Sequence, residues 1–97
     1  MGFIVHDAVE IKNSGVMLSD MYVSCLGNIH LQKHESDYEL VTNMMIFKDK
    51  AARESNKRHL DSFIVSAPFL LSDTVETIYE KLYTQAHGVY TSITADP

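Results

Sequence analysis

The stretch that decides the fold is Val16–Phe47, VMLSDMYVSCLGNIHLQKHESDYELVTNMMIF, in which apolar and polar residues alternate over long runs. Met21, Val23 and Cys25 share one parity, which predicts a half-buried strand over Val16–Leu26. Alternation of this kind, interrupted by turn-forming residues, is typical of antiparallel sheets. We therefore expect a meander of antiparallel strands in this part of the chain.

The first expected turn of this meander is the one that places apolar side chains of neighbouring strands opposite each other. A two-residue turn at Gly27-Asn28 would place Cys25 opposite His30 and mix apolar with polar faces. A three-residue loop, Leu26-Gly27-Asn28, instead places Cys25 opposite Ile29. We therefore predict a chain reversal at these three residues.

The second expected turn follows from the same argument. A four-residue loop, His34-Glu35-Ser36-Asp37, sets Leu31 opposite Leu40 and leads into a third strand, Tyr38–Phe47. The end of that strand, Met44–Phe47, is apolar at both parities, so we expect both of its faces to be covered.

Further elements flank the meander on both sides. Phe3–Ile11 alternates as another strand would, and Asn13-Ser14-Gly15 is a turn signal. Lys48–Arg58 carries five of the eight basic residues and too few apolar ones for a buried helix, so it is predicted to be a solvated excursion. Ser62–Phe69 alternates again, and Pro68 indicates that this strand is short or lies at a sheet edge.

One amphipathic helix is predicted over Ser72–His87. Ser72 or Asp73 can cap it, and Glu76 has capping-box spacing from Asp73. Gly88 is a natural stop. The apolar stripe at helical spacing consists of Val75, Ile78, Tyr79, Leu82, Tyr83 and Ala86.

These elements define an α+β fold, a mainly antiparallel β-sheet meander with one C-terminal amphipathic helix. We expect a single domain over residues 1–97, because 45% of the chain is hydrophobic and no linker or repeat divides it. Val89–Pro97 is expected to be a tail that is extended or that becomes ordered only with a partner.

Composition excludes several classes of function. The formal net charge of −5 argues against direct binding of nucleic acid, which draws on many Lys and Arg contacts. No apolar run approaches the roughly 20 residues that cross a bilayer. The single cysteine, Cys25, cannot form an internal disulfide, so a reducing setting is expected.

Candidate chemistry is sparse. Cys25, His30 and His34 invite a metal or Cys/His nucleophile hypothesis, but His30 and His34 would lie about 13 Å apart on an extended segment. The carboxylates near the second turn, Glu35 and Asp37 among them, are interpreted as solvated charges. With no nucleotide or hydrolase motif either, we predict no catalytic residue, no metal, no cofactor and no enzyme activity.

Protein contacts are the remaining class of function. Methionines supply adaptable apolar surface that suits contacts with partners, although core filling explains them equally well. A basic segment can meet an acidic patch on a neighbouring subunit. The residues predicted to contact partners are Met44, Met45, Lys48, Lys50, Arg53 and Tyr90.

Three runs carry a resemblance to a known class of proteins. Gly15–Val23, Ile46–Arg53 and Thr77–Tyr83 together resemble small virion proteins of tailed bacteriophages. The resemblance implies a non-enzymatic structural subunit of a tail, baseplate, neck or capsid surface, made in the host cytoplasm and located in the virion. Its partners would be other virion proteins and copies of itself.

Two other hypotheses stay open at this point. The chain could be a small cellular adaptor or regulatory domain that binds one protein partner. It could also be a small enzyme or metal protein centred on Cys25 and His30.

Overall fold

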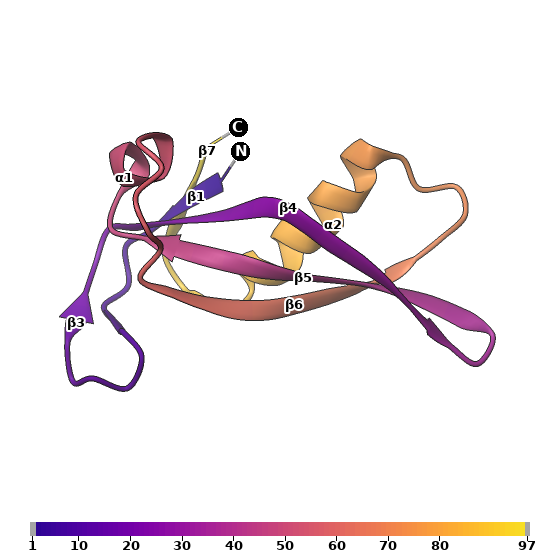
Figure 1. The fold of residues 1–97 in the computed structure, drawn as a ribbon, viewed down its shortest axis with the longest axis horizontal. Coiled ribbons are helices and arrows are strands. Elements are labelled where there is room, and N and C mark those ends of the chain that lie inside the picture. The colour runs from indigo at the N-terminus through magenta and orange to yellow at the C-terminus, as the bar shows by residue number, and fades with distance from the viewer. Residues whose placement is uncertain (1, 97) are drawn as a thin grey trace.

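A computed structural model describes the backbone of residues 2–96 and their side chains apart from those of residues 26–28 and 96. The predicted α+β class is confirmed: one antiparallel sheet carries a C-terminal helix on one face (Figure 1). The order of strands in this sheet is β6-β5-β4-β1-β7, and β2 pairs with β3 in a separate hairpin. The elements are β1 (Gly2–Val5), β2 (Val9–Glu10), β3 (Met17–Leu18), β4 (Met21–His34), β5 (Asp37–Phe47), α1 (Lys50–Glu54), β6 (Asp61–Phe69), α2 (Val75–His87) and β7 (Ile93–Asp96).

The strand β4 runs without a reversal, so the predicted turn at Leu26-Gly27-Asn28 is wrong. Cys25 pairs with Met44 and Ile29 pairs with Thr42, both on β5. Because β4 has two more residues than β5 between these pairs, the register shifts while Cys25 and Ile29 stay on the same face. A two-residue insertion and a three-residue turn therefore produce the same alternation, which is why the pattern could not separate them.

The hairpin between β4 and β5 has the predicted register. Leu31 lies opposite Leu40 and Lys33 lies opposite Tyr38. His34 and Asp37 also pair, so the turn is shorter than predicted and consists of residues 35 and 36. Glu35 adopts a positive φ of 47°, which a tight turn of this kind requires.

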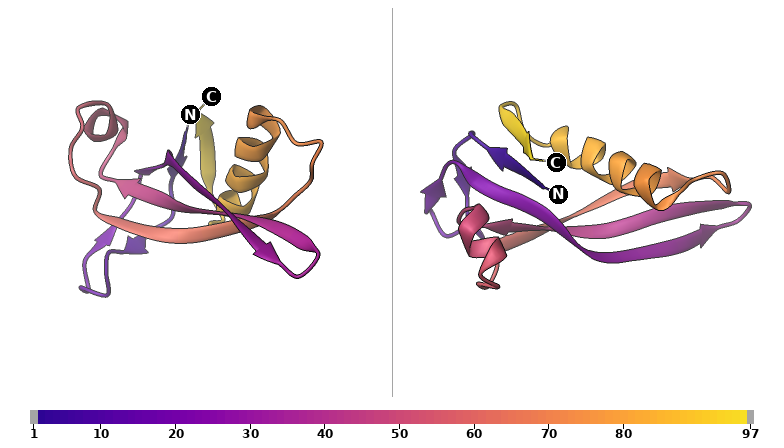
Figure 2. Two further views of the ribbon diagram at one scale, coloured as in Figure 1. Left: turned by 45° about the vertical axis from the view of Figure 1, so that its right-hand side comes forward. Right: turned by 90° about the horizontal axis from the view of Figure 1, so that it is seen from above.

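The hydrophobic core lies between α2 and the inner face of the sheet (Figure 2). The buried side of α2 is formed by Leu82, Tyr83 and Ala86, three residues of the predicted stripe. Phe3 makes edge-to-face contacts with Tyr83 and His87, with ring centroids 6.1 and 4.6 Å apart. The strands contribute the other buried apolar residues, Phe3, Val5, Met21, Val23, Cys25, Leu40, Met44, Ile46, Val65 and Ala67.

The helix α2 starts later than predicted. Its N-cap is Thr74, whose side chain accepts from the amide of Thr77, while the Thr77 hydroxyl accepts from the amide of Thr74. The predicted caps, Ser72 and Asp73, lie outside the helix. Gly88 ends the helix as predicted, although with a right-handed φ of −66°.

Both predicted strands of the N-terminal third are interrupted. The first is divided at residues 6–8 into β1 and β2, and the second at residues 19 and 20 into β3 and β4. Asp20 has a positive φ of 57°, which ends the extended backbone there. The predicted turn at Asn13-Ser14-Gly15 is confirmed, with positive φ at Asn13 and Gly15.

The C-terminal segment is part of the sheet. It is extended, which was one of the two conformations predicted for it. The strand β7 pairs with β1, from Gly2 opposite Asp96 to Val5 opposite Ile93. No partner is needed for this order. The two ends of the chain consequently lie side by side (Figure 2).

Phe47, at the end of β5, is covered as predicted. The Arg53 guanidinium lies 6.0 Å from the centre of its ring, and the His59 ring lies 6.5 Å from it. The excursion at residues 48–58 holds the short helix α1, which buries no residue and has Asp49 as its N-cap. No helix among the described residues is both long and apolar enough to span a membrane.

Candidate functional site

The most open part of the sheet is the outer edge of β6. Pro68 correctly predicted an edge strand, but β6 is nine residues long and not short. No described strand pairs with its outer side. Residues 62–69, SFIVSAPF, contain no charged side chain. Long neutral edges of this kind are templates for pairing with another chain.

The direction of the backbone groups on β6 follows from two hydrogen bonds. The Pro68 carbonyl accepts from Lys81 Nζ at 3.2 Å, so Pro68 presents its backbone away from β5. The amide of Leu60 donates to the Ile46 carbonyl at 2.7 Å, and Asp61 is the register partner of Ile46. Two consecutive residues opposite one residue form a β-bulge, in which Asp61 and Ile46 are a hydrogen-bonded pair, so Asp61 directs its backbone groups toward β5. Since direction alternates along a strand, Ser62, Ile64 and Ser66 direct their N–H and C=O groups toward the outer edge. The Ser62 amide is bonded there to its neighbour, because it donates to Asp61 Oδ1 at 2.8 Å.

Side chains divide between the two faces of β6. Val65 and Ala67 point into the core, at 6% and 4% exposure. Ile64 points to the opposite face and is 69% exposed. A large aliphatic side chain therefore stands in solvent at the middle of the open edge.

A groove runs between α2 and the C-terminal half of β6. Its volume is about 500 Å³, and it is open to solvent. Ala67, Pro68 and Leu70 form its apolar side. The side chains from the α2 side are polar, namely Asp73, Thr77, Glu80, Lys81, Thr84 and Gln85.

An ion pair fixes α2 against this edge. Lys81 Nζ lies 2.6 Å from Asp73 Oδ2, and the Asp73 side chain is only 7% exposed. Asp73 also accepts from the amide of Leu70 at 2.9 Å and from the Thr77 hydroxyl at 3.2 Å. The hydrogen bond from Lys81, followed by the amide of Leu70, lowers the pKa of Asp73 below its ordinary value. The groove thus has a rigid rim.

One of the predicted contact residues, Met44, belongs to the interior, and another, Tyr90, lies partly there. Met44 is completely buried in the core, so it cannot touch a partner, and its prediction as a contact residue is wrong. Tyr90 is half-buried, with its ring 6.1 Å from Phe3 and 5.9 Å from Phe63. Burial, with a smaller effect of Asp61, raises the pKa of Tyr90 to about 12.

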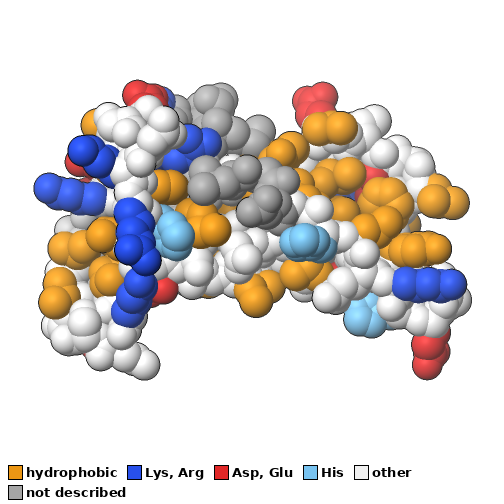
Figure 3. Space-filling view, viewed as in Figure 1, with side chains coloured by type: hydrophobic (Ala, Val, Ile, Leu, Met, Phe, Trp, Pro, Cys, Tyr) orange, Lys and Arg blue, Asp and Glu red, His pale blue; other side chains and the backbone are white. Residues whose placement is uncertain are grey.

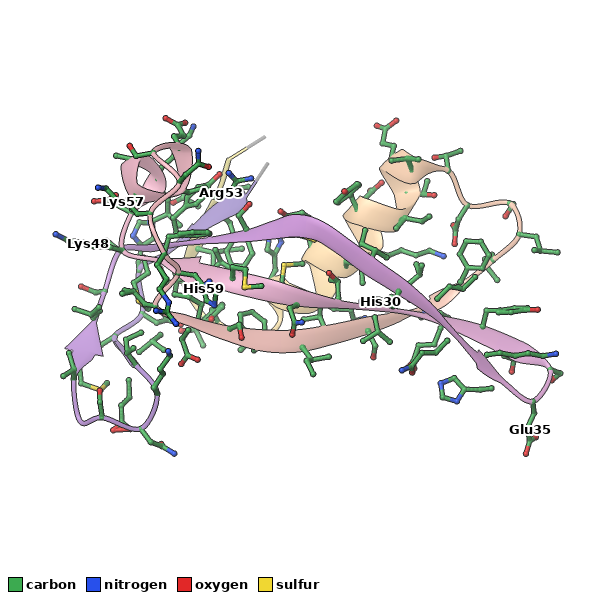
Figure 4. All side chains as sticks on the ribbon, in the orientation of Figure 1. His30, Glu35, Lys48, Arg53, Lys57 and His59 are labelled. Carbon is green, nitrogen blue, oxygen red and sulfur yellow. The ribbon has the colours of Figure 1, made fainter. Side chains whose placement is uncertain are left out.

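The other predicted contact residues remain accessible to different degrees. Lys48 and Lys50 are exposed, whereas Met45 and Arg53 are partly buried. Most of the basic side chains visible in Figure 3 gather at the end of the molecule that carries α1, and Lys48, Arg53, Lys57 and His59 all lie at that end (Figure 4). They form a charged end surface, separate from the groove beside α2.

The residues of the metal hypothesis are not brought together. Cys25 points into the core, with its Sγ 3.4 Å from Thr42 Oγ1, and its amide donates to the Tyr83 hydroxyl at 2.8 Å. His30 pairs with Val41, so it lies on the face opposite Cys25 (Figure 4). His34 is exposed and 3.4 Å from Glu39. Among the described residues, no three His, Cys, Asp or Glu side chains form a cluster that could hold a metal ion.

Comparisons with protein-family models, curated proteins and solved structures gave no match. The candidate site therefore rests on geometry alone. Sequence reasoning identified Pro68 as an edge signal but overlooked the neighbouring run without charge, SFIVSAPF, which a search for unprotected edge strands would have found.

Proposed function

We propose that this protein is a non-enzymatic assembly subunit that joins its neighbours by strand addition at the outer edge of β6. In strand addition, an extended segment pairs with a free sheet edge, and its main chain supplies most of the hydrogen bonds. The observation that carries the proposal is the edge itself: nine residues long, neutral from residue 62 to 69, with the amides of Ile64 and Ser66 directed outward.

The groove beside α2 supports this mode of binding. A strand added along β6 would project alternate side chains toward the inner side of the sheet, where the groove lies. Its mixed lining offers apolar contact from Ala67 and Leu70 and hydrogen bonds from Thr77 and Gln85. Such pockets give specificity, while backbone pairing gives affinity.

The proposed setting is the virion of a tailed bacteriophage. It is supported by the resemblance of Gly15–Val23, Ile46–Arg53 and Thr77–Tyr83 to small virion proteins of such phages. A chain of 97 residues also gains stability when neighbours cover its surface, because a small domain buries a limited share of its own. The partners would be other virion proteins and further copies of the chain.

The basic end surface supplies a second, weaker contact in this proposal. Lys48 and Lys50 are exposed there and could face an acidic patch on a neighbour. Exposed ion pairs contribute little affinity but guide orientation and speed association. We therefore assign binding energy to β6 and orientation to the basic end surface.

The test blocks the outer edge of β6 by substitution and measures the mass of the complexes that form. Proline at position 66 removes one outward amide and leaves the pairing with β5 intact, as Pro68 already does two residues further along. The wild-type chain and Ser66→Pro are each co-expressed with the proteins encoded beside it, and the purified complexes are measured by light scattering.

The proposal expects the wild-type chain to enter a stable multimer, in several copies, and Ser66→Pro to be excluded from it. A wild-type chain that stays monomeric with every neighbour overturns the proposal. A discrete one-to-one complex unaffected by Ser66→Pro also overturns it, and would identify the adaptor alternative. Thermal unfolding of both chains controls for loss of fold.

A further inference from the structure

We infer that the strand added to β6 is β6 of a second copy of this chain, paired antiparallel about a twofold axis at Ile64. This inference rests on the proposed function and names the partner. It makes the two five-stranded sheets one continuous sheet across the dimer.

The outward residues of β6 are arranged symmetrically about Ile64. Ser62, Ile64 and Ser66 are spaced evenly, with Ile64 in the middle. Pairing Ile64 with Ile64 of the second copy therefore pairs Ser62 with Ser66 in both directions. The Ile64 pair can exchange two hydrogen bonds, and each Ser66 amide can donate to the Ser62 carbonyl of the other copy. The Ser62 amide itself donates to Asp61 Oδ1 at 2.8 Å within its own chain, so the ladder uses the outward amides of Ile64 and Ser66. A twofold contact needs such a self-complementary surface.

Proline limits the alternatives. Pro68 has no N–H to donate, and its carbonyl already accepts from Lys81. In the register centred on Ile64, Pro68 lies opposite Leu60 of the second copy, beyond the end of the ladder. A register centred on Ser66 would instead place Pro68 opposite Ile64 and lose a donor at both symmetric positions.

The exposed apolar side chain has a partner in this arrangement. Ile64 is 69% exposed in the single chain. The twofold axis puts the two Ile64 side chains directly opposite each other on the outer face of the joined sheet, where they shield one another from water. The serines beside them carry no charge, so no like charges meet along the ladder.

Charge on the inner face also fits a second copy. Asp61 shares the inner parity of Phe63, and its carboxylate accepts from the amides of Lys12 at 3.0 Å and Ser62 at 2.8 Å within its own chain. The twofold register sets Asp61 of one chain opposite Ala67 of the other, at the groove that Lys81 lines. Lys81 then faces Asp61 of the second copy in addition to its own Asp73, which offsets the like charge of Glu80 in the same groove.

Cysteine cross-linking tests the register directly. Hydrogen-bonded antiparallel partners have Cα atoms about 5.5 Å apart, within the range of about 4.4–6.8 Å that a disulfide spans. Ile64→Cys should therefore form a disulfide-linked dimer under mild oxidation. In Ser66→Cys, the two new thiols would be about 13 Å apart along the strands, so this matched variant should remain uncross-linked. The native Cys25 is buried and is present in both chains.

A second measurement keeps the test independent of the substitutions. Hydrogen exchange of the wild-type amides at positions 64 and 66 should slow at least tenfold as protein concentration rises through the dimer transition seen by light scattering. Exchange that is independent of concentration, or equal cross-linking of both cysteine variants, overturns the register centred on Ile64.

The outcomes separate this inference from the proposed function. If Ile64→Cys stays monomeric and Ser66→Pro still abolishes complexes with other virion proteins, the second copy is the wrong occupant while strand addition on β6 stands. If Ser66→Pro changes neither dimer formation nor the complexes with other virion proteins, both the second-copy inference and strand addition on β6 are wrong.

Discussion

The two edges of the sheet differ in almost every property that controls pairing with another chain. β7 is four residues long and is tied to the segment that follows β1: His6 Nε2 lies 2.7 Å from Thr94 Oγ1, and Thr91 donates to Asp7 from its amide and its hydroxyl. β6 is nine residues long, with Pro68 near one end and Asp61, which accepts from the amides of Lys12 and Ser62, at the other. Short or covered edges resist aggregation, whereas long neutral edges invite pairing. β7 therefore joins the two ends of the fold, whereas β6 is the longer edge and the one that the proposal assigns to a partner.

The largest effect is expected where the two edges meet through the core. Tyr90 contacts both Phe3 of β1, the neighbour of β7, and Phe63 of β6. Tyr90→Ala should lower the free energy of unfolding by about 2–3 kcal/mol, somewhat less than for a fully buried aromatic residue. Urea unfolding measures the change, and Tyr90→Phe, which keeps the ring, serves as control. Unchanged stability together with lost assembly would restore Tyr90 as a contact residue.

A proline substitution in β7 should destabilise the fold more than a proline substitution in β6. The amide of His6 donates to the Ser92 carbonyl, which by alternation makes Ile4 and Thr94 a hydrogen-bonded pair. Thr94→Pro should therefore cost about 2 kcal/mol in the free energy of unfolding, because it leaves an acceptor on β1 without its donor. Ser66→Pro, on the outer side of β6, should cost less than about 1 kcal/mol.

Thermal unfolding compares the two proline variants. Thr94→Ala separates the loss of the hydroxyl contact with His6 from the loss of the backbone bond. Equal destabilisation by both prolines would contradict the assigned direction of the β6 amides.

An inner-face and an outer-face substitution on the same strand should differ as well. Val65→Ala removes two buried carbons and should lower the free energy of unfolding by about 1.5–2 kcal/mol. Ile64→Ala should change it by less than about 0.5 kcal/mol, while it weakens dimerisation. Urea unfolding at a concentration where the chain is monomeric measures both. If Ile64→Ala lowered the free energy of unfolding more than Val65→Ala, Ile64 and not Val65 would lie on the buried face of β6.

The smallest expected effect is a dependence on alkaline pH. Burial raises the pKa of Tyr90 to about 12 from its ordinary value of 10.0, so the folded chain favours the neutral phenol. The resulting stability is fully present below pH 10 and is lost as pH rises from 10 through 12. Because Tyr90 is half-exposed, solvent screens this effect.

The free energy of unfolding of the wild type and of Tyr90→Phe, measured from pH 9 to 12, tests this dependence. Tyr90→Phe should flatten the decline only in part, since burial also raises the pKa of Tyr83. Identical pH profiles for the two chains would contradict the assignment to Tyr90.

The sequence by itself determined which residues share a face of each strand, although not how deeply each is buried, since Leu31 lies opposite Leu40 and is still 51% exposed. Alternation in β4, β5 and β6 assigned Val23, Cys25, Leu40 and Val65 to one face, and the structure buries all four. Local signals of this kind survive because side-chain direction in a strand depends on parity alone. The register of the β4–β5 hairpin was predictable for the same reason. The stop of α2 at Gly88 was predictable because glycine commonly ends helices.

Only the tertiary structure decided how those faces are connected. Parity is identical for a turn and for a two-residue insertion, so nothing local marked residues 26–28 as part of one long strand. Pairing of β7 with β1 joins segments at opposite ends of the chain, and no periodicity within either one announces it. Met44 illustrates the same limit: an adaptable apolar side chain suits a contact surface or a core equally well, and the packing of α2 over the sheet placed it in the core. The open edge of β6 likewise follows from which strands find neighbours, a property of the whole fold rather than of any one segment.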